Sequence, residues 1–173
     1  MTDSFAHRIR LDAIRDGERL DLNADDDERS AIVARLGLAG LARLEAHVGL
    51  SRTGTIVRVE GRLGARVDQC CVVTGDPVTS HVDEPIDLIF MPEPNESGSE
   101  EELELGSADC DVVFYDGASI DLGGAIADTL ALSLDPYPRS AAAEAALKEA
   151  GVLSEEQASP FAVLAALKKG DQP

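Results

Sequence analysis

The chain has 173 residues and a mass of 18.2 kDa, with 44% hydrophobic residues and a formal net charge of −18 at pH 7. This size allows one well-buried core and is small for two, so we expect one domain with appendages. The sequence shows no apolar run of roughly 18 residues and no signal-peptide pattern, so we expect a soluble, cytoplasmic protein with no membrane partner.

The N-terminal part predicts two strands with a helix between them. Residues 7–14 alternate polar and apolar side chains, as in a short strand. Acidic residues 25–28 crowd the expected start of a helix, where the helix dipole favours anions, and Gly37 is its expected end. Apolar residues then occupy every second position from Ala42 to Leu50, which predicts a strand with one buried face.

A longer alternating segment, residues 54–78, predicts the centre of a sheet. Its inward side chains are Val57, Val59, Leu63, Ala65 and Val67, and charged residues alternate with them. The turn Thr74-Gly75-Asp76-Pro77 follows, and residues 78–92 return as another strand. These hairpins predict an α+β fold: an antiparallel β-sheet, open or partly closed, with two or three packing helices.

The C-terminal half begins with a charged stretch. Residues 92–111 contain eight acidic and no basic residues, together with Pro, Gly and Ser, which predicts a flexible acidic loop. Residues 111–117 read as a strand. Ile126, Leu130 and Leu134 recur at a spacing of four, as on one face of a helix that Asp135-Pro136 would end.

A last helix is predicted near the C-terminus, because Ser159 is a plausible N-cap and Pro160 suits the first helical position. We therefore expect a single α+β domain at residues 1–139, which contains the acidic loop. A helical C-terminal tail would follow at residues 140–173.

Catalytic motifs are not found in the sequence. It contains no G-x-S-x-G, P-loop or G-x-G-x-x-G pattern. His7, His47 and His81 fall at alternating positions of predicted strands, as half-exposed sheet residues do. We therefore expect neither an enzyme nor a cofactor.

The three cysteines are unsuited to a metal site. Structural zinc sites usually pair C-x-x-C with a second ligand pair. Cys70 and Cys71 are adjacent in a predicted strand, so their side chains should lie on opposite faces. Cys110 and His81 do not supply a second pair with ligand spacing, so we expect free thiols and no zinc.

Three stretches, taken together and in order, resemble the YceD family, which is associated with accumulation of large-subunit ribosomal RNA in bacteria and plastids. They are QCCVVTGDPV at residues 69–78, LSLDPYPR at 132–139 and SPFAVLAALKK at 159–169. The motif residues are Cys71, Thr74, Asp76, Pro77, Asp135, Pro136, Tyr137, Pro138, Arg139, Pro160 and Phe161.

Members of this family often carry C-x-R-C-x-E-P at the hairpin. Aligned on Pro77, Cys71 takes the place of the first cysteine and Thr74 that of the second. The resemblance thus implies that the turn is retained without the cysteine pair, and a threonine can close a turn through its hydroxyl. It also implies a role in large ribosomal subunit biogenesis without established enzymatic chemistry.

The charge distribution leaves two partner classes open. Residues 67–173 contain 22 acidic and four basic residues and carry the whole net charge. This acidity either keeps the chain soluble or binds a basic ribosomal protein or pre-ribosomal particle. The candidate protein-binding residues are Glu100, Glu101, Glu102 and Glu104.

The alternative is direct RNA binding by a sheet face. Its candidate residues are Arg43, Arg58, Arg62 and Arg66, on the solvated side of the predicted strands. The net charge argues against this alternative, because it repels phosphates. An aromatic content of 3% argues against it too, since it leaves few platforms on which bases can stack.

Overall fold

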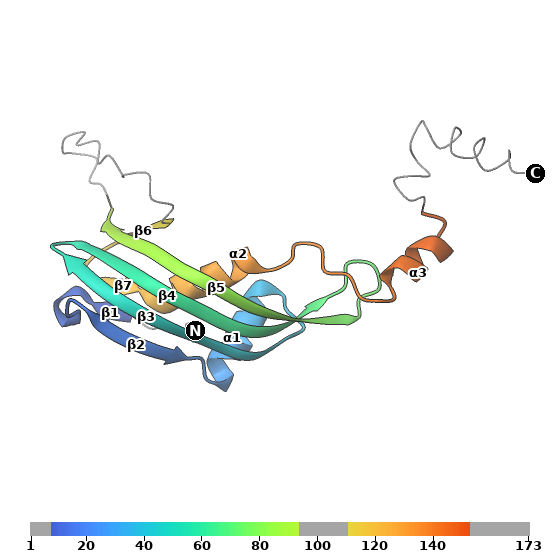
Figure 1. Ribbon diagram of the computed structural model, residues 1–173, viewed down its shortest axis with the longest axis horizontal. Helices are drawn as coiled ribbons and strands as arrows, with labels where there is room; N and C mark the ends of the chain where they lie inside the picture. Colours follow the sequence, from blue (N-terminus) through green and yellow to red (C-terminus); the bar gives the residue numbers. More distant parts are fainter. Residues whose placement is uncertain (1–7, 94–110, 153–173) are drawn as a thin grey trace, which may run out of the picture. The chain divides into compact units, whose positions relative to one another are not determined.

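The computed structural model describes residues 8–93 and 111–152 (Figure 1). The helices and strands of this part are β1 (Arg8–Arg10), a 3-10 helix (Leu11–Ala13), β2 (Glu18–Asn23), α1 (Asp26–Leu36), β3 (Gly40–Thr53), β4 (Ile56–Cys70), β5 (Pro77–Pro92), β6 (Asp111–Tyr115), β7 (Ser119–Asp121), α2 (Leu122–Ser133) and α3 (Ala143–Glu149). They form an α+β fold, as the sequence predicts. No helix in the described ranges is long and apolar enough to cross a membrane.

The described chain divides into two compact units. The sheet unit contains residues 8–69, 79–93 and 111–136, and the tip unit contains residues 70–78 and 137–152. The acidic loop and the helix predicted after Ser159 lie outside the described residues, and the boundary predicted at residue 139 stays a prediction.

The sheet unit contains a five-stranded sheet of order β2-β3-β4-β5-β6, and β1 pairs separately with β7. The pairs β2–β3 and β3–β4 are antiparallel, as predicted. In contrast, β6 runs parallel to β5, with Leu88 opposite Asp111. A parallel pair requires a connection of a dozen or more residues, and residues 93–110 supply it. The sheet is open and not closed into a barrel.

One face of this sheet carries the core, and α1 and α2 lie on that face (Figure 1). The predicted inward residues of β4 are all buried: Val57, Val59, Leu63, Ala65 and Val67. In β3 the prediction for Ala42 was wrong. The register shifts between Leu41 and Arg43, so that Leu41 is buried and Ala42 is exposed. A β-bulge of this kind reverses the alternation before it.

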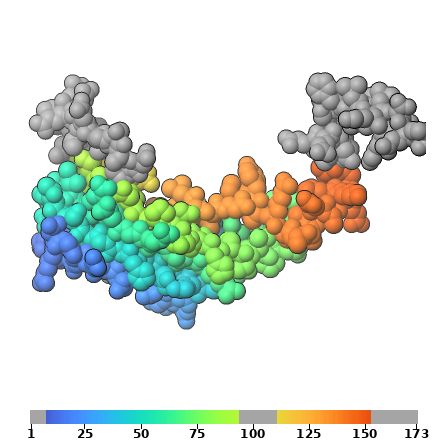
Figure 2. Space-filling model, viewed as in Figure 1, coloured from blue at the N-terminus to red at the C-terminus, as the bar shows by residue number. Residues whose placement is uncertain are grey.

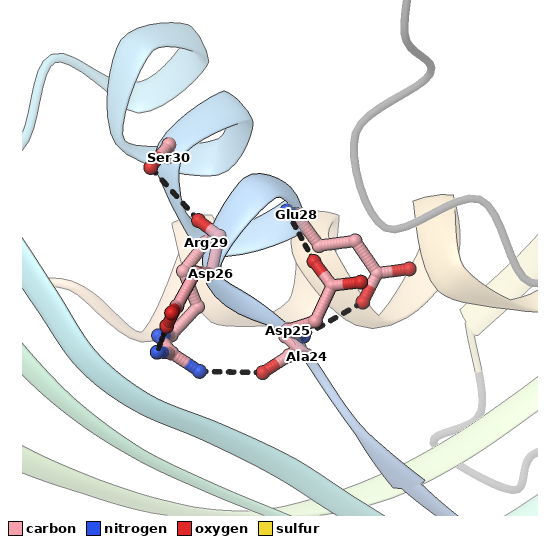
Figure 3. Close-up of polar contacts among 6 residues, drawn as sticks. All are labelled: Ala24, Asp25, Asp26, Glu28, Arg29 and Ser30. Carbon is pink, nitrogen blue, oxygen red and sulfur yellow. Dashed lines mark hydrogen bonds and ion pairs between the residues drawn. The ribbon is translucent and has the colours of Figure 1, made fainter.

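The first helix begins at a capping box (Figure 3). The Asp25 carboxylate accepts a hydrogen bond from the backbone N–H of Glu28 at 2.8 Å, and the Glu28 side chain accepts one from Asp25 N–H at 2.9 Å. Gly37 ends α1 in the left-handed conformation, with φ of 65°. Both predicted ends of this helix are therefore confirmed, and the caps satisfy backbone groups that helix ends leave open.

The predicted second helix is also confirmed. Asp121 caps α2 by accepting a hydrogen bond from Gly124 N–H at 2.8 Å, and Ile126 and Leu130 are fully buried. The helix ends at Ser133, before Asp135-Pro136. Near the N-terminus the expected strand over residues 7–14 was too long, because a 3-10 turn over Leu11–Ala13 ends it.

A glycine allows the central strands to approach each other closely. A Cβ atom on Gly61 of β4 would lie 2.0 Å from the carbonyl oxygen of His47 and 2.8 Å from the Cα of Val48. Both of these are backbone atoms of β3, so a side chain could not be accommodated by a rotamer change. Only glycine fits this position without displacing a strand.

Candidate functional site

The tip unit contains the turn between β4 and β5, where the family motif begins. Cys71 N–H donates to Asp76 O at 2.7 Å, and Gly75 N–H donates to Cys71 O at 2.9 Å. Gly75 has a φ of 76°, a conformation that glycine adopts without strain. Strand β4 ends at Cys70, so Cys71 lies in the turn and not in the strand as predicted. Cys70 is nevertheless exposed and Cys71 is buried, with 3% exposure.

The Cys71 sulfur is the centre of a hydrogen-bond cluster. Its Sγ accepts from the backbone N–H of Ser140 at 3.2 Å and from that of Thr74 at 3.4 Å. The Thr74 hydroxyl is 3.1 Å from the Ser140 hydroxyl and accepts from Asp76 N–H at 3.4 Å. These contacts join the turn to a segment that follows it by more than 60 residues in the chain.

These donors change the acidity of the thiol. The Ser140 backbone N–H, followed by the Thr74 hydroxyl, lowers the pKa of Cys71 to about 6, although burial opposes the shift. Hydrogen bonds to a thiolate favour the ionised form, and burial without such donors disfavours it. The cluster therefore favours the thiolate of Cys71 over the thiol.

The surroundings of this sulfur are N–H and hydroxyl groups and not further metal ligands. Within residues 8–93 and 111–152, no three His, Cys, Asp or Glu side chains are grouped so that they could hold a metal ion. Thr74 supplies a hydroxyl at this position of the turn, and Cys110 lies outside the described residues. The absence of bound zinc stays a prediction.

The second motif stretch crosses from the sheet unit into the tip unit. Asp135 and Pro136 follow α2, and the carbonyl oxygen of Asp135 accepts from the Gln69 amide at 2.9 Å. In the tip unit, Pro138 O accepts from Val72 N–H at 2.9 Å. Pro138 is buried, whereas Tyr137 and Arg139 are exposed. Pro160 and Phe161 belong to the part of the chain that the structure does not describe.

The outer face of the sheet carries the four candidate arginines. Figure 2 shows β3, β4 and β5, coloured teal to green, at the surface in this view. Arg43 pairs with Glu45. Arg58 pairs with Asp87 at 3.0 Å and with Glu60 at 3.3 Å.

Farther along β4, Arg62 pairs with Asp83 at 2.8 Å. Arg66 is exposed and has no ion-pair partner among the described residues, and it lies directly opposite Arg43. The structure thus brings three of the four arginines to carboxylates. Sequence reasoning missed Asp83 and Asp87, although their spacing of four placed them on one face of β5.

The other candidate residues are dispersed. His47 is exposed on β3 and lies 2.6 Å from Asp21, Nδ1 to Oδ1. His81 is exposed on β5. The candidate protein-binding residues Glu100, Glu101, Glu102 and Glu104 all lie outside the described residues, as does His7.

No curated protein and no solved structure matches the chain. A protein-family model does match, over residues 59–168. The matched region contains the β4–β5 turn and the segment that is hydrogen-bonded to it in the tip unit, and it covers more than half of the chain. The chain therefore belongs to the family described as large ribosomal RNA subunit accumulation protein YceD.

Proposed function

We propose that this protein is a non-enzymatic factor in large ribosomal subunit biogenesis, which binds a basic ribosomal protein or a pre-ribosomal particle through its acidic surface. The family name associates the chain with accumulation of large-subunit ribosomal RNA. The binding mode is inferred from the distribution of charge. Three of the candidate arginines are neutralised by neighbouring carboxylates, whereas acidic residues outnumber basic ones by 33 to 15 in the whole sequence.

An acidic rim supports this proposal. Glu93, Asp111 and Asp116 are exposed at the ends of β5 and β6, and no ion pair involves them within the described residues. Glu93 N–H donates to Tyr115 O at 3.1 Å, which brings two of these ends together. Phe114, 57% exposed, lies in the same short strand β6. Exposed carboxylates at the ends of strands, together with an exposed aromatic side chain in β6, suit a basic protein, because opposite fields steer association and the ring supplies contact area.

The acidic segment is continuous with this rim in the sequence. Glu100, Glu101, Glu102 and Glu104 lie between Glu93 and Asp111 in the sequence, so acidic residues are concentrated in this stretch of the chain. Lys-rich and Arg-rich ribosomal proteins are the partners that such a charge attracts most strongly. Solubility alone would not require the charge to gather in one segment.

Direct RNA binding by the sheet face is the second candidate. Arg66 favours it, since this side chain is exposed, unpaired in the described structure and opposite Arg43. Like charges directly across two strands are unfavourable unless an anion or a counter-charge is present. The ion pairs of Arg58 and Arg62 argue against the candidate, because phosphates would have to displace carboxylates that are already in place.

A capture experiment separates the two. Full-length protein is immobilised and incubated with cell extract, with and without ribonuclease, and the retained proteins and RNA are identified. Replacing Glu100, Glu101, Glu102 and Glu104 by Gln is expected to lower recovery of basic large-subunit proteins, whereas replacing Arg58, Arg62 and Arg66 by Gln should matter less. Ribonuclease-sensitive capture of precursor RNA that depends on the arginines and not on the glutamates would overturn the proposal.

A further inference from the structure

Two large apolar or aromatic side chains are exposed in the tip unit. Tyr137 is 72% exposed and Val72 is 53% exposed. Val72 N–H donates to the carbonyl oxygen of Pro138, the residue that follows Tyr137, at 2.9 Å. Around the buried Pro138, both Tyr137 and Arg139 are exposed. A tyrosine ring and a guanidinium are thus presented by one short segment.

Hydrogen bonds hold this segment on both sides of Arg139. Pro138 is held by Val72, and Ser140 N–H is held by the sulfur of Cys71 at 3.2 Å. Proline also restricts the backbone, because its ring fixes φ. A contact surface that is ordered before binding loses less conformational entropy when a partner arrives. The Cys71 cluster therefore positions Tyr137 and Arg139 without touching the partner.

The partner must supply an anionic group and a flat surface. Arg139 has no ion-pair partner among the described residues, in contrast to Arg43, Arg58 and Arg62. A guanidinium binds phosphate oxygens through a planar fork of donors. A tyrosine ring stacks on an unpaired base. Single-stranded RNA offers both groups within one nucleotide.

Charge also favours the tip unit as a place for RNA. Its described residues contain two basic and three acidic side chains, whereas those of the sheet unit contain 11 basic and 20 acidic. Phosphates are repelled least where the net charge is closest to zero. Of the two units, the described tip unit therefore repels RNA less.

We propose that Tyr137, Arg139 and Val72 form a contact site for single-stranded ribosomal RNA. The ring stacks on a base, the guanidinium binds an adjacent phosphate and Val72 extends the apolar surface beside them. This inference goes beyond the proposed function, because it assigns an RNA contact that is distinct from the acidic rim and from the sheet arginines.

Tyrosine fluorescence tests the site directly. The chain contains no tryptophan and two tyrosines, Tyr115 and Tyr137, so the full-length Tyr115→Phe variant has one fluorophore. The probe is a single-stranded oligoribonucleotide copied from large-subunit ribosomal RNA, and a duplex of the same sequence serves as a control. Saturable quenching by the single strand and little quenching by the duplex are expected, because stacking requires an unpaired base.

Affinity measurements on variants of the otherwise unchanged full-length chain give the second readout, with the same oligoribonucleotide carrying a fluorescent label. Tyr137→Ala is expected to weaken binding about tenfold, and Tyr137→Phe to preserve it, since the ring alone stacks. Arg139→Ala should weaken binding at least about fivefold and reduce the salt dependence by about 0.7 in log–log slope, the value for one phosphate contact on a single strand. Arg62→Ala is the matched control, an exposed arginine from which little change is expected.

Three results would overturn the inference: no saturable binding at low salt, equal affinity of Tyr137→Ala and the parent, or a larger loss with Arg62→Ala than with Arg139→Ala. If Tyr137→Ala instead lowers protein capture after ribonuclease and leaves RNA affinity unchanged, the occupant is a protein and the inference is wrong. The glutamate-to-glutamine variant tests the proposed function separately, because its residues are not part of this site.

Discussion

The sheet unit and the tip unit are stabilised by different interactions. In the sheet unit, alternate side chains of three long strands pack against two capped helices, and large residues such as Phe90, Leu63 and Ile126 are almost completely buried. In the described tip unit the buried apolar groups are small, among them Cys71 and Ala143. There the sulfur and two hydroxyls hold the segments together.

This difference has consequences for how each unit responds to change. Burial of apolar area is non-directional and is lost mainly when volume or backbone fit changes. A hydrogen-bond cluster depends on individual donors and acceptors and on the ionisation of its sulfur. Mutations should therefore damage the sheet unit through steric fit and the tip unit through loss of single polar atoms.

The largest effect is expected from Gly61→Ala in the sheet unit. The new methyl group would collide with the backbone of β3, so we expect a loss of about 3 kcal/mol or more in the free energy of unfolding, at the upper end of overpacking effects. Urea unfolding followed by circular dichroism measures it. Gly64→Ala is the matched control in the same strand, because its Cβ would first meet the flexible Glu45 side chain at 3.3 Å. Similar midpoints for both variants would contradict the steric explanation.

Local pattern was sufficient to predict much of this sheet unit. Alternation in β4 identified its five buried residues, and the acidic start and terminal glycine of α1 gave both helix ends. The bulge at Ala42 was missed, because a single extra residue reverses the alternation without a signature of its own. The parallel pairing of β6 was missed for a different reason: strand direction depends on the route of a long connection and not on local residues.

The candidate site was less predictable than the fold. The motif residues were found by resemblance, and the turn was identified from its glycine and proline. The contact of Ser140 with Cys71 was not foreseen, since these residues are far apart in sequence and neither type signals the other. The ion pairs of Arg58 and Arg62 were also missed, because cross-strand partners depend on the register between β4 and β5.

A smaller global effect is expected at the start of α1. Asp25→Ala removes the carboxylate that accepts from Glu28 N–H, so a loss of about 1 kcal/mol in the free energy of unfolding is expected, typical of an N-cap. Asp27→Ala is the control, because this residue lies in the same first turn and accepts no capping bond in the described structure. Equal losses for both variants would show that charge near the helix dipole matters more than the cap.

In the tip unit, Cys71→Ala should act locally. It leaves the N–H groups of Thr74 and Ser140 without their acceptor, so their amide hydrogens are expected to exchange at least about fivefold faster, the scale of one lost hydrogen bond. Amides in the centre of β4 serve as the internal reference and should keep their protection. If exchange accelerates equally in both units, the two units do not open independently and the comparison fails.

The smallest expected effect is a pH dependence confined to the tip unit. Its donors lower the pKa of Cys71 from the ordinary thiol value of 9.0 to about 6, so the folded tip favours the thiolate over the thiol. The associated stabilisation is fully present above pH 9, declines as the pH falls toward 6 and is lost below the folded pKa. Amide exchange of Ser140, corrected for the intrinsic effect of pH, should therefore show protection that decreases over this window. Thr74→Val removes one donor, so the folded pKa of the thiol should rise; the decline should still begin near pH 9 but should end at a higher pH and be smaller. Cys71→Ala should show no such decline, and a tip whose protection is independent of pH in the parent protein would contradict a thiolate-centred cluster.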